Sequence, residues 1–190
     1  FFSNNRNKIN EISSLFNDAS LKILSLLDYN KVESPEELGL TFEENAKIKS
    51  SFGFKRFKKI CFADDSGICI KALNNGPGVN SKNFLGSKEN HKRVLDKIIK
   101  ESKANNMYEA YFQTTICLSL DADEDLLFTG KIFGKISNKI KGERGFGYDP
   151  IFIPRGYHKT FAEMNLNEKN KISHRSIAVG KLINYFKNLV

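Results

Sequence analysis

Apolar residues that recur every three or four positions predict four helices in the chain. They are expected over 9–16, 42–53, 87–103 and 174–189. The second helix has the clearest start, because Thr41 and Glu44 have the spacing of a capping box, in which each side chain accepts a hydrogen bond from the other residue's backbone amide. Gly53 is expected to end this helix.

Continuous or alternating apolar runs predict strands at 1–2, 21–27, 60–70, 109–121, 126–136 and 151–154. The short acidic turn 121–125 favours antiparallel pairing of the strands that it joins, whereas longer links leave room for a crossover helix. The sequence therefore predicts an α/β fold with a mixed sheet flanked by helices. A chain of 190 residues is expected to form a single domain over 1–190.

Two adjacent carboxylates, Asp64 and Asp65, interrupt the apolar run 60–70. Neighbouring residues of a regular strand face opposite ways, so the two side chains cannot both point at the same partner. One is expected to face a site, and the other solvent or backbone amides. The alternative is an Asp-Asp-Ser-Gly hairpin turn with Gly67 at a positive φ, and this segment taken alone favours the turn.

The composition is that of a globular protein, with 40% hydrophobic and 27% charged residues. The sequence has neither an apolar run that could cross a bilayer nor a signal peptide, so a cytoplasmic protein is expected. Cys61, Cys69 and Cys117 lack metal-binding spacing and are expected to be reduced core residues. The net charge of +8 would suit a polyanion, but the lysines are scattered and the charge alone decides little. Because the sequence begins with Phe1 rather than Met, further residues are expected before it.

Three segments are candidates for ligand binding. The turn 3–8 precedes a helix, where backbone amides attract phosphate, but an Asn-rich capped turn explains it equally well. In the loop 142–150, glycines and aromatic rings could hold a flat base, although a tight turn with core aromatics is commoner. Cations gather at the start of the last helix, where its dipole disfavours them unless an anion is bound: Lys169, Lys171, His174 and Arg175.

Taken together and in this order, these segments resemble the inosine triphosphate pyrophosphatase family over essentially the whole chain. The most specific matches are Thr-Phe-Glu-Glu-Asn-Ala at 41–46, Ala-Asp-Asp-Ser-Gly at 63–67, Phe-Gly-Tyr-Asp-Pro-Ile-Phe at 146–152 and Ser-His-Arg at 173–175. The resemblance implies a single two-lobed domain with an elongated sheet. The first loop lacks the family's Gly, and 77–83 lacks its Tyr and Arg, so no site residue is placed in that second segment.

The resemblance also implies roles for individual residues. Asp65 would be the catalytic base and, together with Glu36, a ligand of Mg²⁺, with Glu44 in reserve. The remaining implied contacts are with the substrate: Ser3, Asn4, Asn5, Arg6, Asn7 and Lys8 in the first loop, Ser66 beside the carboxylates, and Phe146, Gly147, Tyr148, Asp149, Lys169, His174 and Arg175 around the base and phosphates.

The implied reaction is hydrolysis of non-standard purine nucleoside triphosphates (ITP, dITP and XTP) at the α-phosphorus, which releases the monophosphate and pyrophosphate. A homodimer is implied, with neither a membrane nor a stable nucleic-acid partner. The alternative is a basic nucleic-acid-binding protein that uses Phe146, Tyr148 and the helix 87–103. The acidic segments 36–44 and 64–65 argue against it, because they would repel a polyanion unless a metal intervened.

Overall fold

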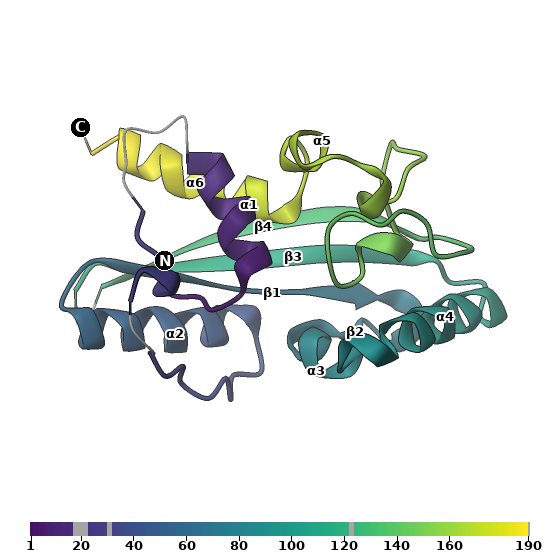
Figure 1. The fold of residues 1–190 in the computed structure, drawn as a ribbon, viewed down its shortest axis with the longest axis horizontal. Helices are drawn as coiled ribbons and strands as arrows, with labels where there is room; N and C mark the ends of the chain where they lie inside the picture. Colours follow the sequence, from purple (N-terminus) through teal and green to yellow (C-terminus); the bar gives the residue numbers. More distant parts are fainter. Residues whose placement is uncertain (17–22, 30–31, 122–123, 190) are drawn as a thin grey trace. The chain divides into compact units, whose positions relative to one another are not determined.

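The computed structural model describes residues 1–16, 23–29, 32–121 and 124–189 (Figure 1). The helices are α1 (Arg6–Phe16), α2 (Phe42–Phe57), α3 (Ser81–Leu85), α4 (Lys88–Ala104), α5 (Leu166–Asn170) and α6 (His174–Lys187). The strands are β1 (Cys61–Ile70), β2 (Gly76–Pro77), β3 (Glu109–Ser119), β4 (Asp125–Ile136) and β5 (Phe152–Pro154). Among the described residues, none of the helices is both long and apolar enough to span a bilayer.

The strands form one five-stranded sheet in the order β2-β1-β3-β4-β5. The β1–β2 pair is antiparallel, with Cys69 opposite Pro77, and so is the β4–β5 pair, with Lys135 opposite Ile153. The expected α/β class, with a sheet flanked by helices, is confirmed. The chain divides into two compact units: unit 1 is Phe1–Asp65, Thr114–Gly130 and Arg175–Val190, and unit 2 is Ser66–Gln113 and Lys131–His174.

In unit 1, helices cover both faces of the strands (Figure 1). On one face, Phe62 of β1 packs with Ile12 of α1 and Leu182 of α6. On the other face, Cys61 and Ala63 pack with the aromatic side chains of α2 and with Phe2. Unit 1 is therefore a sandwich in which consecutive β1 residues face different helices, as the pleat of a strand requires.

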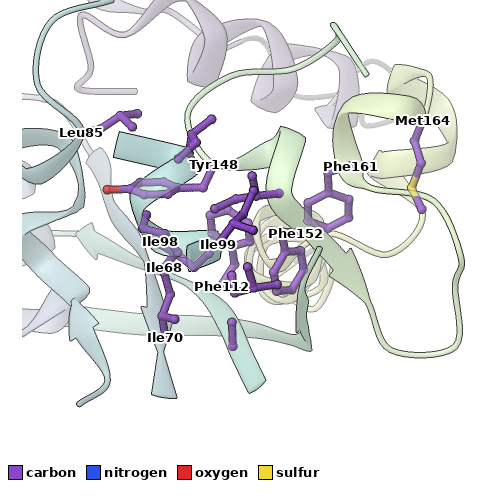
Figure 2. Close-up of a cluster of buried hydrophobic side chains, with 14 residues drawn as sticks. Ile68, Ile70, Leu85, Ile98, Ile99, Phe112, Tyr148, Phe152, Phe161 and Met164 are labelled. Atoms are coloured by element: carbon purple, nitrogen blue, oxygen red, sulfur yellow. The ribbon is translucent and has the colours of Figure 1, made fainter. Parts of the chain in front are cut away.

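Unit 2 has its own core, which Figure 2 shows in close-up. Ile68 and Ile70 of β1 and Phe112 of β3 meet Ile98 and Ile99 of α4. The aromatic rings in this core make edge or tilted contacts, which ring quadrupoles favour: Phe112, Phe152 and Phe161.

Several predicted elements are confirmed. The capping box of α2 is present, with Thr41 Oγ1 accepting from the Glu44 amide at 3.1 Å and Glu44 Oε2 accepting from the Thr41 amide at 3.1 Å. Helix α4 follows the predicted range within one residue at each end, and Leu95, Ile98 and Ile99 are buried. The cysteines are free and buried, as expected: Cys61, Cys69 and Cys117.

Other predictions were wrong. Ser25 caps a short 3₁₀ helix, Leu26–Asp28, where the second strand was expected, and positions 21–22 of that prediction lie outside the described residues. Helix α2 runs past Gly53 to Phe57. A Cβ at Gly53 would collide with the Cys61 and Phe2 side chains, so this glycine allows close packing rather than ending the helix. The sequence alone does not distinguish a glycine that ends a helix from a glycine that allows close packing inside one.

The Asp-Asp-Ser-Gly hairpin turn is also absent, because β1 passes through Asp64–Gly67 without a break. Gly67 does not have a positive φ. A Cβ there would meet the Gly78 carbonyl and the Ser81 hydroxyl, and the neighbouring Ile68 amide donates to Ser81 Oγ at 2.9 Å. Gly67 therefore provides room for a neighbouring segment of unit 2 rather than a turn.

Candidate active site

The pleat of β1 sends Asp64 and Asp65 to opposite faces of unit 1. Asp64 lies on the face of Phe62, toward α1 and α6, and Asp65 on the face of Ala63, toward α2. Asp64 is only 2% exposed and Asp65 only 5%, so each buried carboxylate needs polar or charged partners, which the helices supply. The prediction that the two would not share a partner is confirmed, but neither faces solvent.

Asp64 is held by two cations. Its Oδ2 lies 2.9 Å from Lys8 Nζ of α1 and 3.6 Å from Arg175 Nη2 of α6, and Arg175 also pairs with Glu11. Burial alone would raise the pKa of Asp64, but Lys8 and Arg175 outweigh it and lower the pKa to about 2. Burial also lowers the pKa of Lys8 despite the neighbouring Asp64. This face of β1 carries a charge-balanced, buried network.

Side chains of the polar segment before α1 cap the start of that helix. Asn5 Oδ1 accepts hydrogen bonds from the amides of Asn7 at 3.0 Å and Lys8 at 3.3 Å, and Ser3 Oγ accepts from the Asn5 amide at 3.2 Å. Asn4 Nδ2 donates to Ser34 Oγ at 3.1 Å. Helix α1 therefore starts at Arg6, inside the stretch expected to be a turn. Binding of an anion by 3–8 stays a prediction.

Asp65 faces a second cation and an amide from α2. Lys49 Nζ lies 3.2 Å from Asp65 Oδ1, and Asn45 Nδ2 donates to Asp65 Oδ2 at 3.3 Å. Lys49 also pairs with Glu37 at 2.8 Å. Burial raises the pKa of Asp65 although Lys49 opposes it, while Asp65 and other carboxylates outweigh burial and raise the pKa of Lys49. A carboxylate with a raised pKa is a better proton acceptor.

Sequence reasoning missed Asn45, Lys49 and Glu37. The signal was available, because Asn45 and Lys49 are four residues apart on a helix and so share a face. The Thr-Phe-Glu-Glu-Asn-Ala match was used only for its cap and its acidic residues. The expected ligand Glu36 is exposed, and Glu44 accepts from the Leu40 and Thr41 amides in the capping box.

The donor set at Asp65 suits a metal ion that is completed by substrate. Among the described residues, no group of three or more His, Cys, Asp or Glu could hold a metal on its own. Mg²⁺ usually binds through one or two carboxylates together with substrate phosphates and waters. Asp65 with a carboxylate of the loop at Glu36 and Glu37 fits that pattern, and the cation that now bridges Glu37 and Asp65 is Lys49.

Unit 2 gathers another set of predicted residues around Asp149. Lys169 Nζ lies 2.6 Å from Asp149 Oδ2, which also accepts from the Phe146 amide at 2.8 Å. Lys169 stands 5.1 Å from the centre of the Phe146 ring, within range of a cation–π contact. Gly145 has φ +72°, and a Cβ there would collide with the Asp149 carboxylate. The loop 142–150 is therefore folded around a buried ion pair.

The other predicted residues of unit 2 are mostly buried. Tyr148 is 4% exposed and donates from its hydroxyl to the Ser81 carbonyl at 2.7 Å, and Figure 2 shows its ring within the core. His174 stacks on Phe112, with ring centres 4.6 Å apart and planes 9° apart. Ser66 is half-buried in β1, and Gly147 has φ +66°. Buried side chains such as Tyr148 shape this unit rather than offer an open stacking surface.

Comparison with known proteins gives one family. The model of the Ham1 family matches residues 1–185. The dITP/XTP pyrophosphatase of Flavobacterium psychrophilum is 43% identical over 188 residues, which cover 99% of this chain and 98% of the relative. The dITP/XTP pyrophosphatase of Christiangramia forsetii is 42% identical over 185 residues, covering 97% of this chain and 96% of the relative.

Solved structures agree with the sequence relatives. The HAM1 protein of Coxiella burnetii has a TM-score of 0.86 at 33% identity, with 98% of this chain and 96% of that chain covered. The Ham1 protein of Staphylococcus aureus has a TM-score of 0.81 at 34% identity, with coverage of 99% and 97%. The same fold therefore extends over nearly the whole chain.

Proposed function

Because the chain belongs to the Ham1 family, we propose that it hydrolyses non-standard purine nucleoside triphosphates to the monophosphate and pyrophosphate. The substrate class is inferred from the relatives, which are named dITP/XTP pyrophosphatases. The observation that carries the proposal within this chain is Asp65, a buried carboxylate of raised pKa that Lys49 and Asn45 hold in place. A strand interior keeps such a carboxylate only at a cost, which a catalytic role explains.

Asp65 acts as the base that orients and deprotonates the attacking water. Its pKa is raised mainly by burial, and Lys49 restrains its Oδ1. Lys8 binds phosphate and offsets the charge that develops on the leaving pyrophosphate, because it lies in the first turn of α1, where the Lys8 backbone amide is capped by Asn5 and the ammonium pairs with Asp64. Lys8 would exchange its contact with Asp64 for a contact with a phosphate oxygen.

Asp65 together with Glu36 would hold Mg²⁺, and Glu37 is a further carboxylate of the same loop. A bound Mg²⁺ supplies charge neutralisation at phosphate oxygens. Residues of the chain have the other roles. Asp65 positions the water, and the Lys49 ammonium bridges the Glu37 and Asp65 carboxylates and offsets the repulsion between them. A requirement for a divalent metal follows from this proposal.

In unit 2, the loop at Phe146–Asp149, with Lys169 and His174, is proposed to recognise the base. Arg175 of unit 1 is proposed as a separate substrate contact, on the family resemblance alone. Donors that face a 6-oxo group would remain unpaired against the amino group of adenine, at a cost of about 1–3 kcal/mol for each buried group. Lys169 is the charged donor of this set, and Asp149 fixes its position.

A nucleic-acid-binding protein without catalytic activity is not supported. Base stacking needs exposed ring faces. Tyr148 is 4% exposed, and Lys169 lies over the ring of Phe146. We also propose a homodimer, on the family resemblance, and sedimentation of the purified protein tests that point separately.

One assay tests the function. The protein is incubated with ITP, dITP, XTP, ATP and GTP in the presence of Mg²⁺, and pyrophosphate is resolved from orthophosphate. Pyrophosphate and monophosphate from ITP, dITP and XTP, with little from ATP, is the expected result. Release of orthophosphate instead would indicate a phosphatase, and no turnover of any nucleotide would refute the proposal.

A further inference from the structure

The side chain of Asn45 joins two parts of unit 1 that are distant in sequence. Its Oδ1 accepts from the Gly39 amide at 2.8 Å, and its Nδ2 donates to the Gly39 carbonyl at 3.2 Å. The remaining N–H of Nδ2 donates to Asp65 Oδ2 at 3.3 Å. Both N–H groups of the amide are therefore used, one on the backbone of the acidic loop 33–39 and one on the proposed catalytic carboxylate.

The contact with Gly39 requires a residue without a side chain. A Cβ on Gly39 would lie 2.7 Å from Asn45 Oδ1 and 2.7 Å from Glu44 Cβ, which is closer than real Cβ contacts. Asn45 is 3% exposed, so its hydrogen bonds are shielded from water, and a lost partner would leave a buried polar group. Gly39 and Asn45 thus form a matched pair, called here the Asn45–Gly39 clamp.

We propose that Asn45 is a positioning residue that fixes the acidic loop relative to Asp65 and so sets the spacing of the carboxylates used in hydrolysis. The inference rests on the proposed function, because it takes Asp65 as base and a loop carboxylate as metal ligand. The clamp holds Gly39, two residues after Glu37, by two hydrogen bonds, one to its N–H and one to its carbonyl. The same amide orients Asp65 Oδ2, while Lys49 holds Oδ1.

This arrangement makes Asn45 different from an ordinary cap or core amide. The helix start is already satisfied by Thr41 and Glu44, which cap α2 without Asn45. Without Asn45 the loop would stay attached through the Leu40 amide and through the pair of Glu37 with Lys49, yet its backbone at Gly39 would lose both hydrogen bonds. Residues that orient metal-binding carboxylates typically change metal affinity or activity by 10–100-fold when replaced.

The test compares three variants with one control. Asn45→Ala removes the clamp, Asn45→Asp keeps the shape but has no N–H donors, and Gly39→Ala breaks the clamp from the other side. Thr41→Ala is the control, because it weakens the start of the same helix and leaves the clamp intact. Folding of each variant is checked by circular dichroism and thermal unfolding.

Three readouts are measured on the full chain. Hydrogen–deuterium exchange of the peptide 33–40 reports the clamp without nucleotide. Binding of Mn²⁺, which accepts the same oxygen ligands as Mg²⁺, is followed by electron paramagnetic resonance. Steady-state hydrolysis of ITP gives kcat, KM and the Mg²⁺ concentration for half-maximal rate.

We expect faster exchange of 33–40 in the three clamp variants but not in Thr41→Ala. We also expect weaker Mn²⁺ binding and a higher Mg²⁺ requirement, with kcat lower by about 10-fold and KM for ITP little changed. The two parts of the clamp act together, so the double variant Asn45→Ala with Gly39→Ala should be no worse than either alone.

A folded Asn45→Asp protein with kcat and Mg²⁺ requirement within about two-fold of the wild type would overturn the inference. So would an equal loss of kcat in Thr41→Ala, because that would assign the effect to helix stability. Failure of the proposed function is a separate result: the wild type would then hydrolyse none of the nucleotides, while exchange of 33–40 would still report whether the clamp exists.

Discussion

Asp64 and Asp65 show that position on the strand, not residue type, determines what a carboxylate can do. Asp64 is balanced by Lys8 and Arg175, which hold its pKa at about 2, so it remains charged and accepts no proton near neutral pH. Asp65 has a raised pKa and its nearest cation is shared with Glu37. Of the two, Asp65 is the one suited to act as a base.

Asp65→Asn should abolish turnover without unfolding the protein. The amide is isosteric, but it neither accepts a proton nor serves as a good Mg²⁺ ligand, so a loss of at least about 100-fold in kcat is expected. The measurement is ITP hydrolysis, with thermal unfolding as the control for folding. Near-normal turnover in a folded Asp65→Asn protein would remove Asp65 from the mechanism.

Lys8→Ala should weaken the binding of all nucleoside triphosphates to the same extent. Lys8 lies beside Asp64 at the start of α1 and is assigned to phosphate, so its loss is expected to raise KM for ITP and ATP by the same factor. The ratio of kcat/KM for the two substrates is the quantity to measure. A changed ratio would contradict the assignment and move Lys8 to base recognition.

Arg175→Ala should have two effects that must be separated. Arg175 is 1% exposed and pairs with Glu11 and Asp64, so removing it leaves buried carboxylates uncompensated and should cost about 3–5 kcal/mol of folding stability. If Arg175 also contacts the base, the preference for ITP over ATP should narrow by roughly one to two decades, as expected for a lost bond of about 1.5–3 kcal/mol.

Glu11→Gln provides the comparison for Arg175→Ala, because it disturbs the same ion-pair network and keeps the guanidinium. Stability is read from denaturant unfolding, and selectivity from kcat/KM on ITP and ATP. Equal loss on both substrates in Arg175→Ala would make Arg175 a phosphate or structural residue, and selectivity would then rest on His174 or on the backbone of Phe146–Asp149.

Among the secondary-structure elements, α2 and β1 pack so closely that the contact requires a glycine in α2. Gly53 lies inside α2, and a Cβ there would collide with Cys61 Sγ and come 2.8 Å from the Phe2 ring. Gly53→Ala should therefore destabilise the protein by about 1–3 kcal/mol, even though Ala favours a helix over Gly by about 1 kcal/mol. The free energy of unfolding in urea measures the change.

Gly180→Ala in α6 is the matched control for Gly53→Ala. Both glycines lie within helices, but a Cβ at Gly180 would meet nothing within 4 Å. Gly180→Ala should thus stabilise the protein by up to about 1 kcal/mol. Destabilisation by both substitutions would show that close approach at Gly53 is not the cause.

At the scale of the whole molecule, buried thiols should make folding sensitive to alkaline pH. Burial raises the pKa of Cys61 and of Cys117 from the usual 9.0 to about 11. Between these values the unfolded chain has lost thiol protons that the folded chain keeps, so stability falls as pH rises from 9 to 11. Each thiol should contribute on the order of 2 kcal/mol to this loss.

The alkaline prediction is tested by measuring the free energy of unfolding at pH 8, 9, 10 and 11 for the wild type and for Cys117→Ala. The variant should lose less stability over this range. A thiol reagent at pH 8 provides a second reading, because free and buried cysteines should react only after unfolding. Equal pH dependence in the two proteins would show that Cys117 is not responsible.

The α/β class, the capping box of α2 and most of α4 could be predicted from the sequence alone, whereas the opposite orientation of Asp64 and Asp65 followed only if β1 was a regular strand rather than the favoured turn. Each of these depends on local spacing: a period of 3.6 for a helix, a period of two for a strand, and a three-residue separation for a cap. The resemblance to known enzymes rested on such local segments as well, and the family comparison confirmed it.

The partners of the glycines and of the residues near Asp65 depend on tertiary packing. Gly53 and Gly67 resemble turn or end signals in sequence, but both are needed where another segment comes close. Asn45 and Lys49 became part of the site only because α2 packs against the face of β1 that carries Asp65. Close contacts between segments distant in sequence leave no periodic signal, since they depend on how folded elements pack rather than on neighbouring residues.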